Sequence, residues 1–174
     1  VEVFNLENEK TTVEFEANQL KACAVTSTKG TAVRVIRKGR LGFSASTDRM
    51  AVNKLATNVL ESAAYGDQTS FSFADPKSAI AVRTYDKAIA ELPINRLIEI
   101  GQEILDLILP VDPIVRCNLS LARGLVSANI RNQKGLDVSF QTSPLTLSIT
   151  LNRVEENDVL IRYEQFGTTV WEKD

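Results

Sequence analysis

The segment from Gly30 to Asp48, GTAVRVIRKGRLGFSASTD, constrains the fold more tightly than any other part of the sequence. An apolar, largely β-branched run at residues 31–36 predicts a strand, and Lys38-Gly39 predicts a turn after it. Residues 41–43 then resume an apolar alternation, and Ser46-Thr47-Asp48 offers oxygens that can cap a helix. The segment therefore predicts a β-hairpin that leads directly into a helix.

Alternating apolar and polar residues predict further strands on both sides of this hairpin. Val13 and Phe15 share one face of a strand while Glu14 and Glu16 share the other, as in an antiparallel sheet with one wet face. The predicted strands span residues 1–8, 11–27 (with a break near Ala17-Asn18), 31–46, 114–132, 135–154 and 159–170. The predicted later turns are Arg123-Gly124, Lys134-Gly135, Ser143-Pro144 and Glu156-Asn157-Asp158.

Two segments have the three- and four-residue apolar spacing of amphipathic helices. The first spans residues 48–64, and Gly66 follows it. Its apolar stripe, which we expect to pack on the sheet, consists of Met50, Val52, Leu55, Ala56, Val59, Leu60 and Ala63. The second spans residues 93–108. Gly101 lies on its apolar stripe at a cost of about 1 kcal/mol relative to alanine, which predicts a close approach to a neighbouring element.

These elements predict an α+β fold, with an antiparallel β-sheet, two packed helices and the order β-β-β-α then α-β-β-β. The first half comprises residues 1–66 and the second half residues 92–174. Residues 67–91 lack periodicity and form the predicted connector between the halves. All 174 residues constitute one predicted amino-terminal domain of a larger protein.

Composition excludes several classes of function. The net charge of −2 gives no overall field that would attract nucleic acid or a membrane surface, so we expect neither as a direct partner. The chain opens inside a strand-like run, without a charged leader or a long apolar segment, and we expect a trimmed cytoplasmic protein. Cys23 and Cys117 lie in apolar strand-like contexts, which predicts two buried thiols rather than a disulfide.

The sequence contains no histidine. Serine or cysteine catalysis that depends on an imidazole base, and a metal centre ligated by histidine, are therefore excluded within these residues. The carboxylate pairs that could bind a hard cation are Glu14/Glu16, Glu155/Glu156 and Asp106/Asp112, and we predict a metal at none of them. The basic group that could bind an anion consists of Arg34, Arg37, Lys38 and Arg40, for which a solvated turn is the favoured interpretation. We predict no catalytic, cofactor-binding or metal-binding residue.

Together with the first 22 residues, VEVFNLENEKTTVEFEANQLKA, the hairpin segment resembles the amino-terminal region of the TldD/PmbA proteins, described as metallopeptidases and as modulators of DNA gyrase. Residues 130–151, IRNQKGLDVSFQTSPLTLSITL, resemble a later turn-and-strand part of the same proteins. The resemblance implies a fragment that lacks the carboxy-terminal HExxxH catalytic region, with zinc bound elsewhere in the full-length family member. It also implies assembly from two related subunits, as a homo- or hetero-oligomer, that cleave peptides or unfolded protein.

The function implied by this resemblance is that of an accessory or assembly domain of a peptide-processing metallopeptidase. The alternative is a non-enzymatic interaction or scaffold module, a partner-type subunit without metal. In either case an exposed strand edge within residues 159–170, with Arg162 and Tyr163, is a candidate contact for a peptide or a partner. Trp171 is either a further hydrophobic anchor for a partner or a side chain packed on its own domain.

Overall fold

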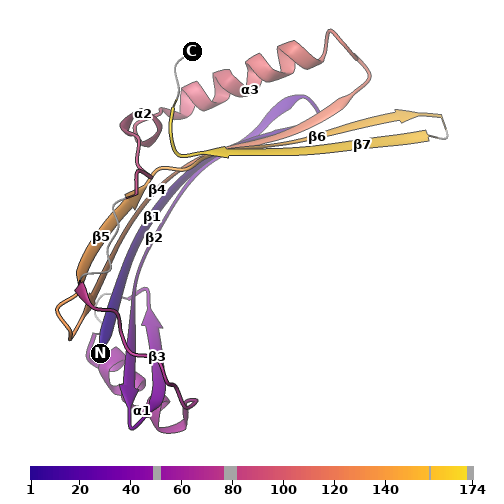
Figure 1. The fold of residues 1–174 in the computed structure, drawn as a ribbon. Helices are drawn as coiled ribbons and strands as arrows, with labels where there is room; N and C mark the ends of the chain where they lie inside the picture. The colour runs from indigo at the N-terminus through magenta and orange to yellow at the C-terminus, as the bar shows by residue number, and fades with distance from the viewer. Residues whose placement is uncertain (49–51, 77–81, 157, 172–174) are drawn as a thin grey trace. The chain divides into compact units, whose positions relative to one another are not determined.

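A computed structural model describes residues 1–48, 52–76, 82–156 and 158–171 (Figure 1). The predicted α+β class and the order β-β-β-α then α-β-β-β are confirmed, with one short extra helix between the two long ones. The elements are β1 (Glu2–Glu16), β2 (Gln19–Arg37), β3 (Arg40–Ser46), α1 (Val52–Tyr65), α2 (Lys87–Ala90), α3 (Ile94–Ile108), β4 (Arg116–Asn132), β5 (Asp137–Thr142), β6 (Leu145–Glu155) and β7 (Asp158–Thr168).

The strands form one seven-stranded sheet in the order β3-β2-β1-β4-β6-β7, and β5 pairs with β4 beside this path. The pairs β2–β3, β4–β6 and β6–β7 are antiparallel. The chain divides into two compact units, and β1, β2, β4 and, through its last residue, β5 contribute residues to both. Unit 1 comprises Val1–Asn8, Ser27–Arg83 and Val126–Gln141; unit 2 comprises Glu9–Thr26, Thr84–Leu125 and Thr142–Asp174.

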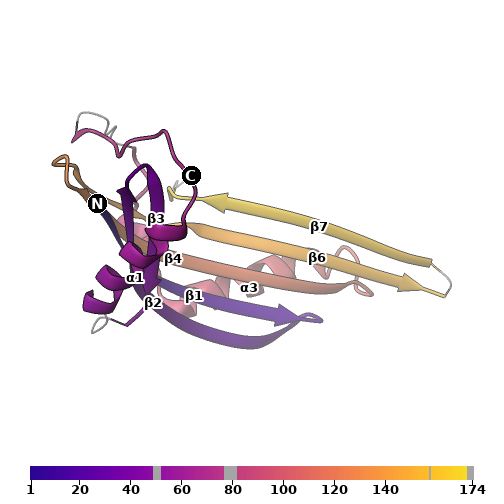
Figure 2. The same cartoon turned by 90° about the horizontal axis from the view of Figure 1, so that it is seen from below.

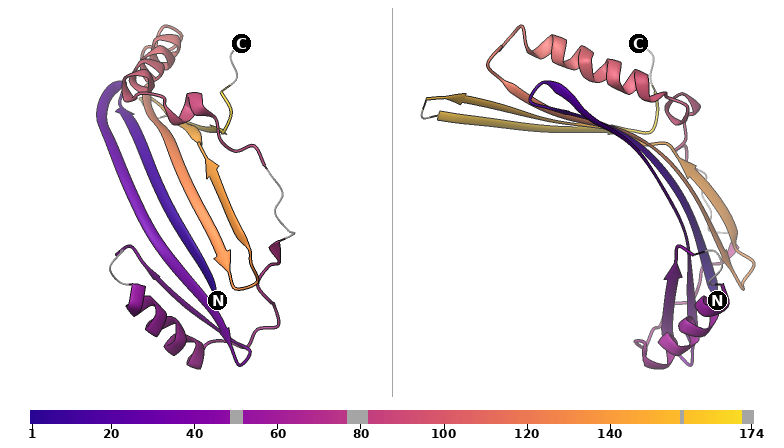
Figure 3. Two further views of the ribbon diagram at one scale, coloured as in Figure 1. Left: turned by 90° about the vertical axis from the view of Figure 1, so that its left-hand side faces the viewer. Right: turned by 180° about the vertical axis from the view of Figure 1, so that it is seen from behind.

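In unit 1, helix α1 packs on the β2–β3 hairpin (Figure 3), as its apolar stripe predicts. Val59 and Ala63 join Val35 of β2 in a buried cluster. Gly42 of β3 makes this close packing feasible, because a Cβ atom there would lie 2.2 Å from the backbone oxygen of Val59. The buried stripe is narrower than predicted: Leu55 is buried as well, but Ala56 and Leu60 are exposed. Met50 lies outside the described residues.

Part of the predicted connector is ordered against unit 1. The backbone N–H of Leu41 donates to Asp67 at 3.0 Å, and the N–H of Thr69 donates to Gly39 at 2.8 Å. Phe73 is buried. The ring of Phe71 packs edge-on against the ring of Phe73, with 6.2 Å between the ring centroids. The later part of the connector contains α2, in unit 2, which begins where the Asp86 carboxylate accepts a hydrogen bond from the N–H of Ala88.

In unit 2, α3 covers one face of the sheet (Figure 2). Leu97 and Leu105 of α3 are fully buried, as is Val13 on β1. The predicted close approach at Gly101 is confirmed, because a Cβ atom there would lie 2.2 Å from Cε2 of Phe15. The core of unit 2 is therefore a tight layer between α3 and strands β1, β4 and β6.

Three predicted interruptions of strands are wrong. β1 continues through residues 9–10, β2 continues through residues 28–30, and β4 continues through Arg123-Gly124. The polar residues 9–10 and 28–29 do not end β1 and β2, because their side chains lie at exposed positions. Nearby, the Lys29 ammonium of β2 forms an ion pair with the Glu7 carboxylate of β1 at 3.1 Å. Gly124 permits a close approach instead of a turn: a Cβ atom there would lie 3.0 Å from Pro144, whose carbonyl accepts the Gly124 N–H at 2.7 Å.

The turn between β1 and β2 is fixed by Asn18. Ala17 and Asn18 both have positive φ, 48° and 72°, which asparagine tolerates better than most residues. The Asn18 side chain accepts the N–H of Cys117 at 2.7 Å and donates to the carbonyl of Val115 at 2.9 Å. It thereby satisfies backbone groups at the start of β4 that would otherwise lack partners.

Asn18→Ala is expected to lower the free energy of unfolding by about 2 kcal/mol, because it removes two hydrogen bonds and places alanine at positive φ. Asn18→Gly removes the same hydrogen bonds but accepts positive φ, so its loss should be smaller. Urea unfolding of the two variants measures both contributions. Equal stability of Asn18→Ala and the parent chain would contradict the role assigned to this side chain.

The prediction of two buried thiols is half right. Cys117 is fully buried, and burial raises the pKa of its thiol to about 11. Cys23 is exposed, as are all β2 residues from 19 to 29, because the core of unit 2 forms on β1, β4 and β6. The apolar residues around Cys23, at positions 22–25, therefore did not indicate a buried part of β2. Both cysteines are free thiols.

One thiol should react with a disulfide reagent in the native protein near pH 8, and two in denaturant. Cys23 is open to solvent, whereas Cys117 is buried and, with its pKa of about 11, stays protonated at that pH. The measurement is a spectrophotometric thiol titration with Cys23→Ser as the matched control, which should show no native reaction. Rapid reaction of the control would contradict the burial of Cys117.

Candidate functional site

The strand β7 is an open edge of the sheet. It pairs with β6 on one side, and no strand of the described chain pairs with it on the other. Figure 2 shows β7 as the outermost strand beside β6. Every residue from 158 to 167 is exposed. An edge strand of this kind presents unpaired N–H and C=O groups to which another extended chain can hydrogen bond.

The hairpin geometry shows which backbone groups of β7 point outward. The β6–β7 hairpin closes on the pair Glu155–Asp158, with two residues between them. The closing pair of such a hairpin is hydrogen bonded, and hydrogen-bonded and non-hydrogen-bonded pairs then alternate along the ladder. Even-numbered residues of β7 thus bond to β6. The residues whose N–H and C=O groups face outward are Val159, Ile161, Tyr163, Gln165 and Gly167.

The same register assigns the side chains to the two faces of the sheet. Arg162 lies opposite Leu151, and Phe166 lies opposite Leu147, two β6 residues that pack on the core. Even-numbered side chains of β7 therefore lie on the face that α3 covers. Tyr163 lies opposite Thr150, so the odd-numbered side chains lie on the other, polar face.

Both faces of β7 carry large exposed apolar side chains. Natural edge strands are normally protected from other chains by charges, proline or bulges. β7 carries charges, Arg162 and Glu164 among them, but it also has apolar side chains that are 52% to 62% exposed, with aromatic residues among them. These are Val159, Leu160, Ile161, Tyr163 and Phe166. An apolar surface beside an open edge is typical of a site that another polypeptide covers.

The structure does not gather the three predicted contact residues into one cluster. Arg162 lines an apolar groove of about 330 Å³, together with Leu160 and the end of α3. Tyr163 points to the opposite face, where its hydroxyl donates to Gln165 at 3.2 Å. Trp171 lies beyond the end of β7: it packs against the core of unit 2, and its backbone N–H donates to Asp86 at 2.9 Å.

Sequence reasoning missed the apolar members of this edge. Val159, Leu160 and Ile161 are three consecutive apolar residues. In a strand such a run places apolar side chains on both faces, which normally indicates a strand buried on both sides. When such a run lies in an edge strand, it indicates a surface that another polypeptide contacts.

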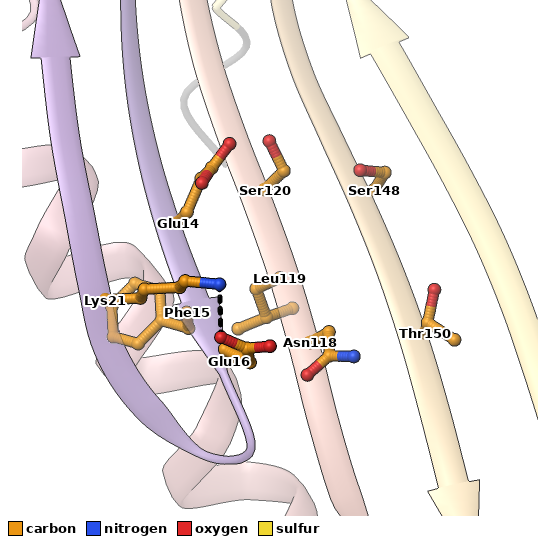
Figure 4. A pocket seen from close by; sticks show the side chains of 9 residues that line it. All are labelled: Glu14, Phe15, Glu16, Lys21, Asn118, Leu119, Ser120, Ser148 and Thr150. Atoms are coloured by element: carbon orange, nitrogen blue, oxygen red, sulfur yellow. Dashed lines mark ion pairs between the residues drawn. The ribbon is translucent and has the colours of Figure 1, made fainter.

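A second, polar groove of about 260 Å³ lies on the uncovered face of unit 2 (Figure 4). Glu16 forms an ion pair with Lys21 across the β1–β2 turn, and this hydrogen bond raises the pKa of Lys21. Glu14, Ser120, Ser148 and Thr150 also line the groove. This arrangement agrees with the predicted wet face of the sheet and contains no imidazole or thiol for catalysis.

Among the described residues, no three or more His, Cys, Asp or Glu side chains are grouped so that they could hold a metal ion. The zinc implied by the family resemblance therefore has no ligand set in this part of the chain. Two members of the basic group are engaged internally: Arg34 pairs with Glu2, and Arg40 donates to the carbonyl of Gly66 at 2.7 Å. No helix of the described chain is both long and apolar enough to cross a membrane.

Comparison with known protein families gives a match to "PmbA/TldA metallopeptidase domain 1" over residues 1–63. The resemblance to the TldD/PmbA family is confirmed. The matched residues contain β1, β2, β3 and most of α1, which are the hairpin-and-helix segment and the strands before it. No curated protein matches the sequence.

Solved structures extend the likeness of fold to nearly the whole chain. TldE from Thermococcus kodakarensis superposes with a TM-score of 0.84 at 15% identity, over 97% of this chain. Proteins described as modulators of DNA gyrase from Thermotoga maritima and Bacteroides thetaiotaomicron superpose with TM-scores of 0.78 and 0.80, at 15% and 18% identity, over 95% and 97% of this chain. The chain spans 40%, 38% and 40% of the chains of these three structures, respectively.

Proposed function

We propose that this chain is an accessory and assembly domain of a TldD/PmbA-like metallopeptidase that processes peptides. The catalytic metal site of such an enzyme lies outside these 174 residues, because they contain no histidine. The domain supplies the open edge of β7, which binds an extended polypeptide by backbone hydrogen bonds. Peptide substrates and a related subunit are the two classes of partner that such an edge can accept.

One observation carries this proposal: β7 combines an unpaired backbone edge with exposed apolar side chains on both faces. Binding by strand addition draws its affinity from main-chain hydrogen bonds, and side chains on alternating faces add selectivity. The family match of residues 1–63 supports the link to a metallopeptidase. A related subunit as partner is what the resemblance to the TldD/PmbA family implies.

Tyr163→Pro is expected to weaken binding of an extended chain by about tenfold, since it removes an outward N–H and leaves the bonds to β6 in place. The probe is fluorescently labelled, reduced and carboxymethylated α-lactalbumin, a protein that stays unfolded. Binding is measured by anisotropy. Tyr163→Ala, which keeps the N–H, is the matched control. Unchanged affinity in a folded Tyr163→Pro variant would contradict edge binding.

A non-enzymatic scaffold is the alternative function, and peptide cleavage with added zinc distinguishes the two. We expect the 174-residue chain alone to be inactive, and the complete protein that contains it to cleave peptides in a chelator-sensitive manner. An inactive complete protein that still binds peptides would favour the scaffold. Chelator-sensitive cleavage by the 174-residue chain would contradict the placement of the metal site.

A further inference from the structure

The sequence of β7 is complementary to itself when it is read in the opposite direction. Its residues from 158 to 168 read DVLIRYEQFGT, with Tyr163 at the centre. Arg162 and Glu164 flank this centre with opposite charges, and Leu160 and Phe166 lie three positions from it on either side. A strand with this pattern can form favourable pairs with a second copy of itself in an antiparallel ladder.

We propose that β7 pairs with β7 of a second copy of this chain, antiparallel and around a two-fold axis at Tyr163. The inference rests on the proposed function, because it names the partner of the same strand edge. Such an interface is isologous, so that each contact occurs twice. The pairing would join the two sheets through their open edges and bring the exposed apolar side chains of the two strands into lateral contact.

The backbone geometry agrees with this register. Residues with outward-facing N–H and C=O groups must lie opposite one another to exchange hydrogen bonds. An axis at Tyr163 places Tyr163 opposite its own copy, Ile161 opposite Gln165 and Val159 opposite Gly167. All five residues belong to the outward-facing set that the β6–β7 register defines.

The side chains then meet at the non-hydrogen-bonded positions, where opposing Cα atoms come closest, at about 4.5 Å. Arg162 of each copy lies opposite Glu164 of the other, and Leu160 lies opposite Phe166. Both kinds of pair occur twice. The ion pairs formed among the described residues include neither Arg162 nor Glu164, so both charges can pair with a second copy.

Neighbouring registers are unfavourable. An axis at Arg162 would place the two Arg162 guanidinium groups opposite each other, and an axis at Glu164 would do the same with two carboxylates. Like charges directly opposite each other destabilise a strand pair. Of these three registers, charge favours the one centred on Tyr163, and the exposed apolar side chains of the two strands gain contact with one another in it.

The decisive experiment exchanges the charges one at a time. Arg162→Glu creates two Glu–Glu pairs in a homodimer, and Glu164→Arg creates two Arg–Arg pairs. Each variant alone should self-associate at least roughly tenfold more weakly than the parent chain in sedimentation equilibrium, because two attractive pairs become repulsive. An equimolar mixture of the two variants restores every opposite-charge pair and should recover association. The double variant Arg162→Glu/Glu164→Arg should recover it as well.

A cross-link tests the register directly. In a Cys23→Ser background, which removes the exposed native thiol, Tyr163→Cys places two thiols at the axis and should form a disulfide-linked dimer on mild oxidation. Ile161→Cys is the matched control: its thiol lies opposite Gln165, so cross-linking should be at least roughly tenfold slower. Equal cross-linking of both variants would overturn the register.

The outcomes separate this inference from the proposed function. A parent chain that stays monomeric, or single variants that associate as well as the parent, would overturn pairing between copies. Binding of carboxymethylated α-lactalbumin depends on the outward backbone groups and should persist in Arg162→Glu. If that binding persists while self-association fails, the edge binds other chains but not itself. If Tyr163→Pro keeps both α-lactalbumin binding and self-association, the proposed binding at the β7 edge is wrong.

Discussion

Gly101→Ala is expected to destabilise the protein by about 2 kcal/mol, although alanine favours a helix by about 1 kcal/mol over glycine. The added Cβ atom would lie 2.2 Å from Cε2 and 2.7 Å from Cζ of Phe15. Phe15 is 3% exposed, so its ring is packed within the core of unit 2. Either the ring or α3 must shift, and overpacking of a buried core costs about 1–3 kcal/mol or more.

Urea unfolding of a double-mutant cycle checks the cause. The atoms that an added Cβ at Gly101 would meet belong to the side chain of Phe15, so Phe15→Leu removes the clash. Phe15→Leu also lowers the free energy of unfolding by itself, because it removes buried ring atoms. The double variant should therefore lose less stability than the sum of the two single variants, by about 1–2 kcal/mol. Gln102→Ala, at an exposed position in the same helix, is the control and should change stability by less than about 0.5 kcal/mol. Additive losses would show that Gly101 and Phe15 do not compete for space.

Local sequence patterns predicted those parts of the fold in which one element determines its own geometry. The hairpin at Lys38-Gly39 was predictable because both residues adopt positive φ, 51° and 75°, as a tight turn between right-twisted strands requires. The role of Gly101 was predictable because glycine on an apolar helical stripe has a cost that close packing explains. Each inference needed only the residues within a single segment.

The wrong predictions concern properties that depend on distant segments. Gly124 was interpreted as a turn, but its lack of a Cβ atom accommodates Pro144, which follows twenty positions later in the sequence. Cys23 is exposed because α3 packs over β1 and β4, and nothing near Cys23 indicates which strands α3 covers. Arg162 and Tyr163 do lie on a strand at the end of the sheet, but that they lie on opposite faces follows only from the β6–β7 register.

Gly42→Ala is expected to have the larger effect of the two glycine substitutions, a loss of about 3 kcal/mol. Its Cβ atom would lie 2.2 Å from the backbone oxygen of Val59 and 2.7 Å from both the backbone nitrogen and the Cβ of Ala63. Because two of these atoms belong to the α1 backbone, no change of rotamer relieves the clash, and the whole helix must move away from β3. Val59 and Ala63 would then lose their burial against Val35.

This difference between the two glycines is testable by rescue. Ala63→Gly removes only the Cβ contact and leaves both backbone contacts, so Gly42→Ala/Ala63→Gly should remain nearly as unstable as Gly42→Ala, unlike the rescue expected for Gly101 with Phe15→Leu. Hydrogen exchange of the α1 amides should accelerate in both Gly42 variants, since α1 loses its packing on the sheet. Gly167→Ala is the matched control in a strand, where the nearest atom lies at 3.8 Å. Unchanged α1 exchange in Gly42→Ala would mean that the helix does not depend on this contact with β3.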